Sequence, residues 1–438
     1  MSRRAIIAMF GLAIAAPASS QIKVDITGGL SQPMPIAIPA MPTPQQTSTP
    51  AGDTAALGNR IAEVITADLK GSGLFTPLGP GSLRPVAMPQ VAAPDFTFWT
   101  TTGAQALVQG SVRANGNGSL TVGCYLYDVF AKTLMVQQEF TIGAQYWRRT
   151  AHKCADLVYT RLTGEGPYFD SRVVYVSETG PKNNRTKRLA IMDQDGASHR
   201  FLTNGQSLVL TPRFAPNQQT ITYMSYVKKQ PRVYVYSIGS GTQRLIVNQP
   251  YMTFSPRFSP DSRSIIFSMS VGGNTDLYRV GAGGGAPVRL TTSPGIDTGA
   301  SYSPDGRQIV FESDRGGTQQ LYVMNADGSG QRRISFGGGR YATPVWSPRG
   351  DLIAFTKIGG GFNIGILRPD GSGEKILSDG WQDEGPSWSP NGRVIIFFRT
   401  ARGSGRADLV SVDLTGVNTR KIPTPLDGSD PSWSPLLP

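Results

Sequence analysis

The residue types that most often carry acid–base or nucleophilic catalysis are scarce in this sequence. Only two histidines occur among its 438 residues, His152 and His199. His152 falls in a predicted helix and His199 in a predicted turn of a second domain, so we expect no catalytic triad and interpret both as surface or capping residues. No Gly-x-Ser-x-Gly nucleophile elbow, zinc-ligand cluster or phosphate-binding loop occurs. The sequence therefore favours binding over catalysis.

Three acidic turns carry further residues that could do chemistry, because carboxylates in a Gly-containing loop can bind calcium. These turns span residues 193–196, 325–328 and 368–371. They lack the later bidentate Glu and the full ligand count of an EF-hand loop. Ordinary turn formation explains them, since Asp bonds back to the backbone and Gly takes the corner. We therefore predict no metal and no cofactor.

The two cysteines are Cys124, in a predicted strand, and Cys154, on the core face of a predicted helix. Both belong to the same predicted domain. A disulfide is allowed in an oxidising compartment. Two separate buried thiols fit equally well, because a sequence does not give the Cα separation.

A short sequence motif repeats along the chain and predicts the strands of the second domain. An aromatic residue two positions before a proline recurs six times, and successive prolines are 42 to 45 residues apart. The signatures end at Pro216, Pro260, Pro304, Pro348, Pro390 and Pro435. A repeat in the low forties is the period of a propeller blade.

Each repeat predicts four short antiparallel strands. The fullest example runs from the turn Ser303–Gly306 through β-rich runs at 308–311 and 320–324 to a last strand at 333–335. Such a unit is the blade of a β-propeller.

The order of the strands also predicts how the ring closes. Strands two to four of one blade precede the first signature, at 172–177, 188–192 and 200–203, whereas no strands follow the last signature. We therefore expect the C-terminal strand to complete the first blade of a six-bladed ring, which removes the exposed sheet edges.

The chain before the ring differs from it in kind. Residues 1–20 resemble a secretory signal peptide, with two arginines, a short apolar stretch and a small-residue cleavage site. Residues 21–168 predict a small α/β domain, and residues 169–438 form the propeller. The α/β domain has expected strands at 35–39, 106–112, 120–129 and 134–142 and expected helices at 57–69 and 145–162. The mature protein should be soluble and exported.

The formal net charge is +12, from 42 basic and 30 acidic residues. An exported basic protein could meet anionic surfaces such as peptidoglycan. Because the charges form no runs, we favour a simple solubility role for them. No helix-turn-helix, zinc-finger or RNP signature occurs, and we expect no nucleic-acid partner.

Loops on one face of the ring are the remaining place for function. In propellers, the loop before each first strand and the loop between the second and third strands lie around one mouth of the central channel. The loops before the first strands mix apolar, aromatic and acidic residues, which suits an exposed protein-binding rim. We predict this rim from Leu210, Met252, Thr253, Phe254, Asp297, Thr298, Tyr341, Ala342, Asp383, Glu384, Ser429 and Asp430. The other loops contribute Lys228, Lys229, Arg315, Lys357, Arg399, Arg402 and Arg406.

Together these features resemble the TolB family, the periplasmic components of the Tol-Pal system of Gram-negative bacteria. The resemblance covers essentially the whole chain, and the combined order of its motifs is specific. It rests on Gln21–Ile26 followed by Pro35–Pro39, on Ala67–Phe75, on Arg161–Gly164 and on the closing Trp433–Pro435.

The resemblance implies a non-catalytic adaptor. Its propeller is expected to bind Pal, the peptidoglycan-associated lipoprotein, and its N-terminal segment, residues 21–32, to bind TolA. Such a system keeps the outer membrane intact and constricts it at division, and colicins exploit the same propeller face. The expected TolA contacts are Ile22, Lys23, Val24, Asp25 and Ile26. Thr298-Gly299 replaces a Thr-Glu pair of the family and Met252 a common His, so individual Pal contacts should differ.

Two alternatives belong to other classes of protein. One is an exported hydrolase or lyase built on the ring, and the other is a polysaccharide-binding propeller. An enzyme would need histidines and carboxylates clustered at the channel, whereas the ring's one histidine, His199, falls in a turn on the opposite face. We expect a monomer whose partners are Pal, TolA and, in addition, other outer-membrane or peptidoglycan-associated proteins and colicins.

Overall fold

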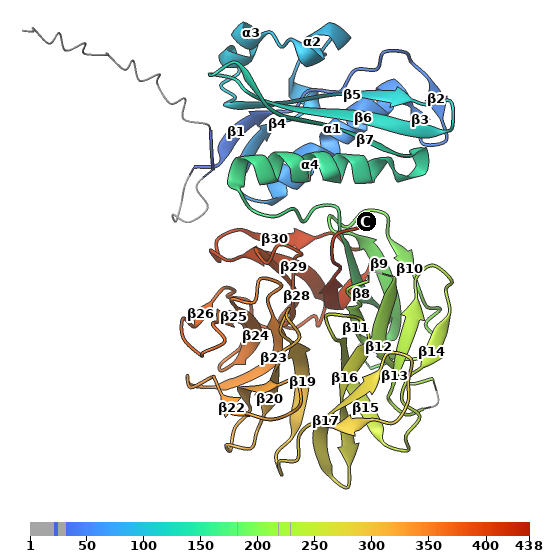
Figure 1. Cartoon of the computed structure of the whole chain (residues 1–438), viewed down its shortest axis with the longest axis vertical. Helices are drawn as coiled ribbons and strands as arrows, with labels where there is room; N and C mark the ends of the chain where they lie inside the picture. The colour runs from blue at the N-terminus through green and yellow to red at the C-terminus, as the bar shows by residue number, and fades with distance from the viewer. Residues whose placement is uncertain (1–21, 25–31, 182, 218, 228) are drawn as a thin grey trace, which may run out of the picture.

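A computed structural model describes residues 22–24 and 32–438, except 182, 218 and 228. It shows an N-terminal α/β domain beside a six-bladed propeller (Figure 1). The predicted signal peptide lies outside the described residues, as do Asp25 and Ile26. Among the helices that the structure describes, none has the length and apolar character needed to cross a membrane.

The N-terminal domain is built on a five-stranded sheet in the order β4-β1-β5-β6-β7. Strand β1 is parallel to β4 and β5, whereas β5, β6 and β7 are antiparallel neighbours. The strands are β1 Met34–Ala37, β4 Phe75–Leu78, β5 Ala106–Ala114, β6 Ser119–Asp128 and β7 Thr133–Gly143. The four predicted strands are confirmed. Strand β4 was not predicted, because it has four residues and includes a proline.

Two long helices cover one face of this sheet, and shorter ones lie on the other (Figure 1). The long helices are α1 Thr54–Gly71 and α4 Trp147–Thr163, as predicted. Asp53 caps α1 by accepting a hydrogen bond from the Ala55 amide. The smaller elements are α2 Met88–Ala92, α3 Phe96–Thr101, the 3₁₀ turns η1 Pro80–Ser82 and η2 Ala144–Tyr146, and the hairpin β2 Ser48–Thr49 and β3 Gly52–Asp53.

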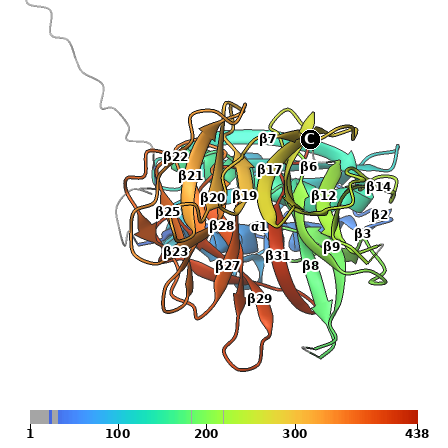
Figure 2. The same ribbon diagram turned by 90° about the horizontal axis from the view of Figure 1, so that it is seen from below.

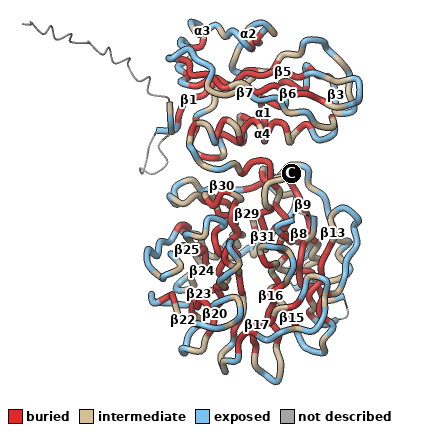
Figure 3. The backbone as a smooth tube through the Cα atoms, viewed as in Figure 1, coloured by how far each residue is buried: buried red, intermediate tan, exposed pale blue. Residues whose placement is uncertain are grey.

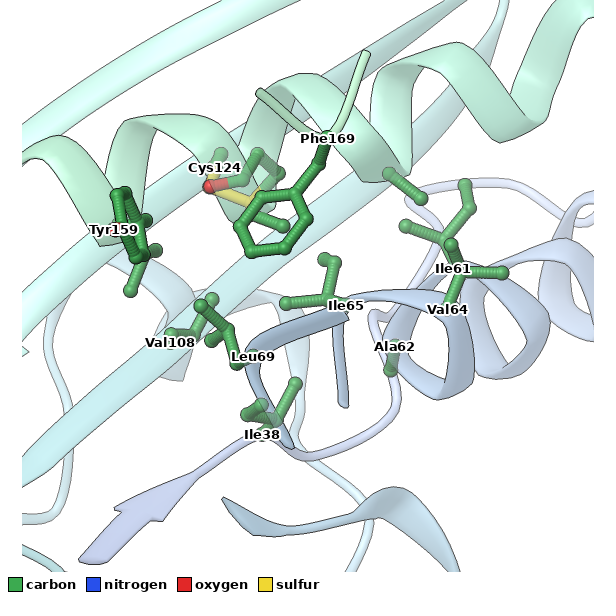
Figure 4. Packing of buried hydrophobic residues seen from close by; sticks show 14 of the residues in the cluster. Ile38, Ile61, Ala62, Val64, Ile65, Leu69, Val108, Cys124, Tyr159 and Phe169 are labelled. Carbon is green, nitrogen blue, oxygen red and sulfur yellow. A yellow bond between two sulfur atoms is a disulfide. The ribbon is translucent and has the colours of Figure 1, made fainter. Parts of the chain in front are cut away.

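A disulfide joins the sheet to α4 within the core of this domain. Cys124 in β6 and Cys154 in α4 are bonded, with 5.8 Å between their Cα atoms. Figure 4 shows Cys124 packed among Ile65, Leu69 and Phe169. Of the two arrangements that the sequence allowed, the structure shows the bonded one.

The propeller consists of six four-stranded sheets, each antiparallel throughout. Five blades follow the chain in order: β11–β14, β15–β18, β19–β22, β23–β26 and β27–β30. Their first three strands are β11 Val209–Phe214, β12 Thr220–Ser225, β13 Arg232–Ser237, β15 Met252–Phe258, β16 Ser264–Val271, β17 Asn274–Gly281, β19 Asp297–Tyr302, β20 Gln308–Ser313, β21 Gln320–Asn325, β23 Arg340–Trp346, β24 Ile353–Ile358, β25 Phe362–Leu367, β27 Asp383–Trp388, β28 Val394–Thr400 and β29 Ala407–Asp413. Their short outer strands are β14 Gln243–Leu245, β18 Val288–Arg289, β22 Arg332–Arg333, β26 Lys375–Ile376 and β30 Thr419–Ile422.

The sixth blade closes the ring with strands from both ends of the propeller. Strands β8 Arg172–Thr179, β9 Thr186–Asp193 and β10 Arg200–Phe201 precede the other blades, and β31 Asp427–Trp433 ends the chain. Figure 2 shows β31 beside β8, and Trp433 is opposite Val173 in the register. The Trp433 indole also donates a 2.8 Å hydrogen bond to the Ser171 hydroxyl. The predicted closure by the C-terminal strand is confirmed.

The signature turns do what their residue types predict. In the clearest one, Asp305 accepts hydrogen bonds from the Ser303 hydroxyl (2.5 Å) and the Arg307 amide (3.0 Å). Gly306 takes a left-handed conformation with φ of +72°. The acidic turns at 325–328 and 368–371 behave in the same way, since Asp327 and Asp370 each accept the amide two residues ahead.

The link between the domains is held by one buried carboxylate. Asp156 in α4 accepts three backbone amides, from Tyr168 (2.7 Å), Phe169 (2.8 Å) and Asp170 (3.0 Å). Burial raises the pKa of Asp156 to about 6, although these three hydrogen bonds oppose the rise. The chain is therefore fixed to α4 immediately before it enters the propeller.

A buried polar cluster then joins the two domains to each other. His152 Nδ1 of α4 lies 2.6 Å from the carboxylate of Asp68 in α1. The side-chain amide of Gln194, in the propeller, donates to the same carboxylate at 2.8 Å. His152 is 2% exposed, so the prediction that it is a surface or capping residue is wrong. Helical spacing alone could not reveal this, because both partners are distant in the chain.

This cluster makes the stability of the protein depend on pH. Burial opposes the charged imidazolium, but the Asp68 charge and hydrogen bond outweigh it, and with Asp195 and Asp193 they raise the pKa of His152 to about 9. Because folding raises the pKa of His152, its protonation stabilises the folded state. This stabilisation is complete below the pKa of the unfolded chain, about 6.5, and is lost as the pH rises through 9.

We predict that His152→Gln lowers the free energy of unfolding at pH 6 by about 3 kcal/mol, because it leaves Asp68 buried without its cation. The loss should shrink toward pH 9, which denaturant titrations at a series of pH values would measure. His199→Gln is the matched control, since the Asp68 cluster does not include His199. Equal pH profiles for the wild type and the His152 variant would contradict this role.

Candidate functional site

The six inner strands share one irregularity near the mouth of the channel. Each first strand has a register shift at the same place, as between Leu210 and Arg213 in β11 and between Glu384 and Ser387 in β27. The residue within each shift has positive φ, between 49° and 66°: Thr211, Ser255, Gly299, Thr343, Gly385 and Asp430. Such a bulge bends a strand locally and changes the direction of the side chains before it.

This bulge decides which of the predicted rim residues reach solvent. The six that are buried are Thr253, Asp297, Tyr341, Ala342, Asp383 and Ser429. Leu210, Phe254, Thr298, Glu384 and Asp430 are half-buried, and Met252 alone is exposed. The prediction that all twelve residues form an exposed surface is therefore wrong for the buried six. Whether the twelve bind a partner stays a prediction.

The buried residues support the loops instead. Asp383, with no exposed surface, forms paired hydrogen bonds of 2.7 and 2.8 Å with the Arg399 guanidinium. Asp297 accepts a single hydrogen bond of 2.7 Å from Arg315. Lys357 pairs with Glu374 and donates to the Tyr341 hydroxyl. Arg315 thus holds a loop between second and third strands against a first strand. Lys357 and Arg399 were predicted in such loops but lie in β24 and β28, directly opposite Tyr341 and Asp383 in the register.

Large apolar side chains project from the loops between blades. Figure 3 shows burial concentrated in the strands and exposure in the loops. The exposed apolar residues of the interblade loops before the first strands are Tyr251, Met252, Ile296, Phe336, Trp381 and Leu426, and we call this set the apolar rim. They come from five of the six interblade loops. An exposed set of this kind, above a rigid ring, is typical of a protein-binding surface.

Two of these aromatic residues have an arginine next to the ring. The Arg402 guanidinium lies 4.6 Å from the centre of the Trp381 ring, and the Arg333 guanidinium 5.2 Å from that of Phe336. The Trp381 carbonyl also accepts the Phe362 amide at 3.2 Å, which ties its loop to β25. Each of the two rings therefore has a cationic partner in the unbound protein, although both remain largely exposed.

Sequence reasoning found Met252 but missed the rest of the apolar rim. The missed residues stand in the loops themselves, up to seven positions before the bulge, among Gly, Ser and Pro residues. A large apolar side chain in such a loop has no core to enter. That signal would have identified Phe336, within Ser335–Gly339, and Trp381, within Asp379–Asp383.

The predicted TolA-binding segment is described only at residues 22–24. Ile22 and Val24 pack against the core of the N-terminal domain, and Lys23 is exposed. The Val24 amide donates to the Leu162 carbonyl at the end of α4, at 2.9 Å. This part of the segment is thus docked on its own domain, and it is not part of a strand.

Comparison with known proteins covers both domains. The TolB amino-terminal domain matches residues 22–135, and the TolB beta propeller domain matches residues 159–437. The chain is 78% identical, over 100% of both chains, to the Tol-Pal system protein TolB of Rhizorhabdus wittichii. It belongs to the TolB family. The corresponding protein of Zymomonas mobilis is 77% identical over 95% of this chain and 91% of its own length.

A solved structure supports the same arrangement of domains. The crystal structure of TolB from Acinetobacter baumannii matches 95% of this chain and 100% of its own, with a TM-score of 0.80 at 27% identity. The α/β domain followed by a six-bladed propeller is therefore the TolB architecture.

The buried pair beneath the apolar rim can be tested directly. We predict that Asp383→Ala lowers the free energy of unfolding by about 3 kcal/mol, because it strands the partly buried Arg399 charge. Asp379→Ala is the matched control: its fully exposed carboxylate lies 3.7 Å from the same guanidinium and should contribute nothing measurable to Tm. Equal thermal shifts for the two variants would show that Asp383 does not anchor this loop.

Proposed function

We propose that this TolB-family chain is a non-catalytic periplasmic adaptor of the Tol-Pal system. In this proposal the propeller binds Pal, and the N-terminal segment, residues 21–32, binds TolA. The complex supports outer-membrane integrity and constriction at cell division. The observation that carries the proposal is the 78% identity, over the full length of both chains, to a protein named Tol-Pal system protein TolB.

The apolar rim supports the first half of this proposal. Interface energy concentrates in a few aromatic and Arg residues that are held in place before binding. Trp381 with Arg402 and Phe336 with Arg333 have this composition, and the arginine contacts favour one position of each ring. We assign Pal to this face, with the apolar rim as its anchor. The half-buried Leu210, Phe254, Thr298, Glu384 and Asp430 form the floor inside it. Colicins would use the same face.

The N-terminal segment supports the second half. Ile22 and Val24 bury apolar surface on the domain through a short stretch with one backbone hydrogen bond to α4. A segment held by so few contacts can exchange between docked and free states, and a partner that binds the free state shifts the populations. If Pal biases this exchange, linkage requires TolA to change the affinity for Pal by the same factor.

The disulfide supports the periplasmic assignment. Disulfides form and persist in the oxidising bacterial periplasm and are rare in the cytosol. The bond between Cys124 and Cys154 is buried in the core of the N-terminal domain. A signal peptide in residues 1–20 would deliver the chain to that compartment.

We predict that the double variant Phe336→Ala, Trp381→Ala weakens Pal binding by at least tenfold in Kd, because it removes two central aromatic anchors. Both side chains are exposed, 72% and 51%, so Tm should not change. Isothermal titration with purified Pal measures the effect. Phe130→Ala is the matched control, since Phe130 is 61% exposed but belongs to the N-terminal domain. Unchanged affinity in the double variant would reject the apolar rim as the Pal site.

We predict that removing residues 21–32 from the mature chain abolishes TolA binding while Pal binding and propeller folding persist. The reason is that the segment supplies the TolA contacts and contributes little to the core. The apolar-rim double variant gives the reciprocal control, because it should lose Pal and keep TolA. A shortened chain that binds TolA normally in a titration would place the TolA site elsewhere.

A further inference from the structure

One ring position inside the propeller channel has a composition that the fold does not require. Two residues after each left-handed bulge residue, the six inner strands present Arg213, Arg257, Ser301, Val345, Ser387 and Ser432. All six line one cavity of about 520 Å³ at the mouth opposite the apolar rim. Two long cationic side chains from neighbouring blades thus face four small residues.

The small residues at this position have a visible structural task. Ser301, Ser387 and Ser432 each accept a backbone amide of the next blade, at 3.2, 2.9 and 3.3 Å. These hydrogen bonds connect neighbouring inner strands. Because each hydroxyl acts as an acceptor there, its own proton remains able to bond a group inside the channel.

The two arginines have no comparable task. Arg213 is 9% exposed, and its one hydrogen bond is to the carbonyl of the adjacent Pro212. Arg257 forms no hydrogen bond or ion pair within the part of the chain that the structure describes. Burial lowers the pKa of both guanidinium groups, and the charge of Arg213 lowers that of Arg257 further. Leaving two cations together in a protein interior is costly without a counter-charge.

The nearest carboxylates supply only part of that counter-charge: the charge of Asp430 opposes the lowering of the Arg213 pKa but does not overcome it. Asp430 and Glu384 line a smaller adjoining cavity of about 110 Å³ together with both arginines. Asp430 accepts the Thr211 amide at 3.1 Å, and Glu384 accepts the side-chain amide of Gln382 at 2.8 Å. Among the described residues, neither carboxylate forms an ion pair with Arg213 or Arg257.

We propose that Arg213 and Arg257 form a binding site for the oxyanion group of a small organic acid. The planar guanidinium groups match a carboxylate or phosphate group in charge and geometry. The Ser301, Ser387 and Ser432 hydroxyls supply further donors, and the aromatic residues of the six signatures form the wall that receives an apolar body. The ligand enters at the mouth opposite the apolar rim. The arginines also line the smaller cavity with Glu384 and Asp430, so the anion site adjoins the floor of the proposed Pal surface.

Thermal unfolding of the full mature chain tests this site. The probes are inorganic phosphate and benzoate, compared with chloride at equal ionic strength. At about ten times its Kd, a bound anion should raise Tm by roughly 3 °C. Benzoate distinguishes a ligand that uses the aromatic wall from one held by its oxyanion group alone. A response to either probe that Arg257→Gln abolishes supports the proposal, and the lack of response to both probes overturns it.

Variants make the test specific. Arg257→Gln should abolish the response and raise Tm in chloride, because it relieves the repulsion from Arg213. Arg257→Lys keeps the charge but not the planar guanidinium group. The probe concentration needed for the same rise in Tm should therefore increase about tenfold. Arg307→Gln is the control, since that side chain is 86% exposed and lies outside the channel. A Tm rise of equal size in the wild type and in Arg257→Gln would overturn the assignment.

Discussion

Pairing of β31 with β8 is the contact on which the rest of the propeller depends. It joins residues at opposite ends of the ring, with Asp427 opposite Glu178 and Trp433 opposite Val173. Without it, the inner strand β31 and the second strand β8 would each present an unpaired edge. The Trp433 indole extends the closure to Ser171, next to the segment that Asp156 fixes to the N-terminal domain. Ring closure and domain docking are therefore parts of one connected structure.

The repeated blade provides a frame, and departures from the repeat provide the candidate sites. Every inner strand has the same bulge, which turns one residue outward and buries another. At the buried position Asp297 holds a loop through Arg315, and Asp383 pairs with Arg399 of β28 and accepts the Gly380 amide of its own loop. At the position two residues after the bulge, each serine accepts an amide from the next blade, whereas Arg213 and Arg257 make no such contact. Two arginines that replace the bridging serines and have no ion-pair partner among the described residues therefore indicate a ligand-binding site.

The architecture could be predicted from the sequence because it repeats. A fixed period, an aromatic before each proline and the missing strands after Trp433 are local signals, and they predict six blades and their closure. The surface was less predictable. The bulge changes side-chain direction over two residues, so Asp383 and Tyr341 are buried where an exposed rim was expected. His152 and Asp68 are 84 residues apart in the chain, so no local sequence pattern could predict their contact.

Thermal unfolding of two truncated chains tests the central claim that the closing strand holds the ring together. Removing residues 427–438 deletes β31 and its buried Trp433, whereas removing 436–438 leaves β31 intact. Losing a buried Trp alone costs about 3–5 kcal/mol, against a total stability of about 5–15 kcal/mol. We expect the longer deletion to aggregate or to lose its cooperative transition, and the shorter one to unfold within a few degrees of the full chain. If the chain without β31 kept both its Tm and its cooperativity, the ring would not depend on this strand.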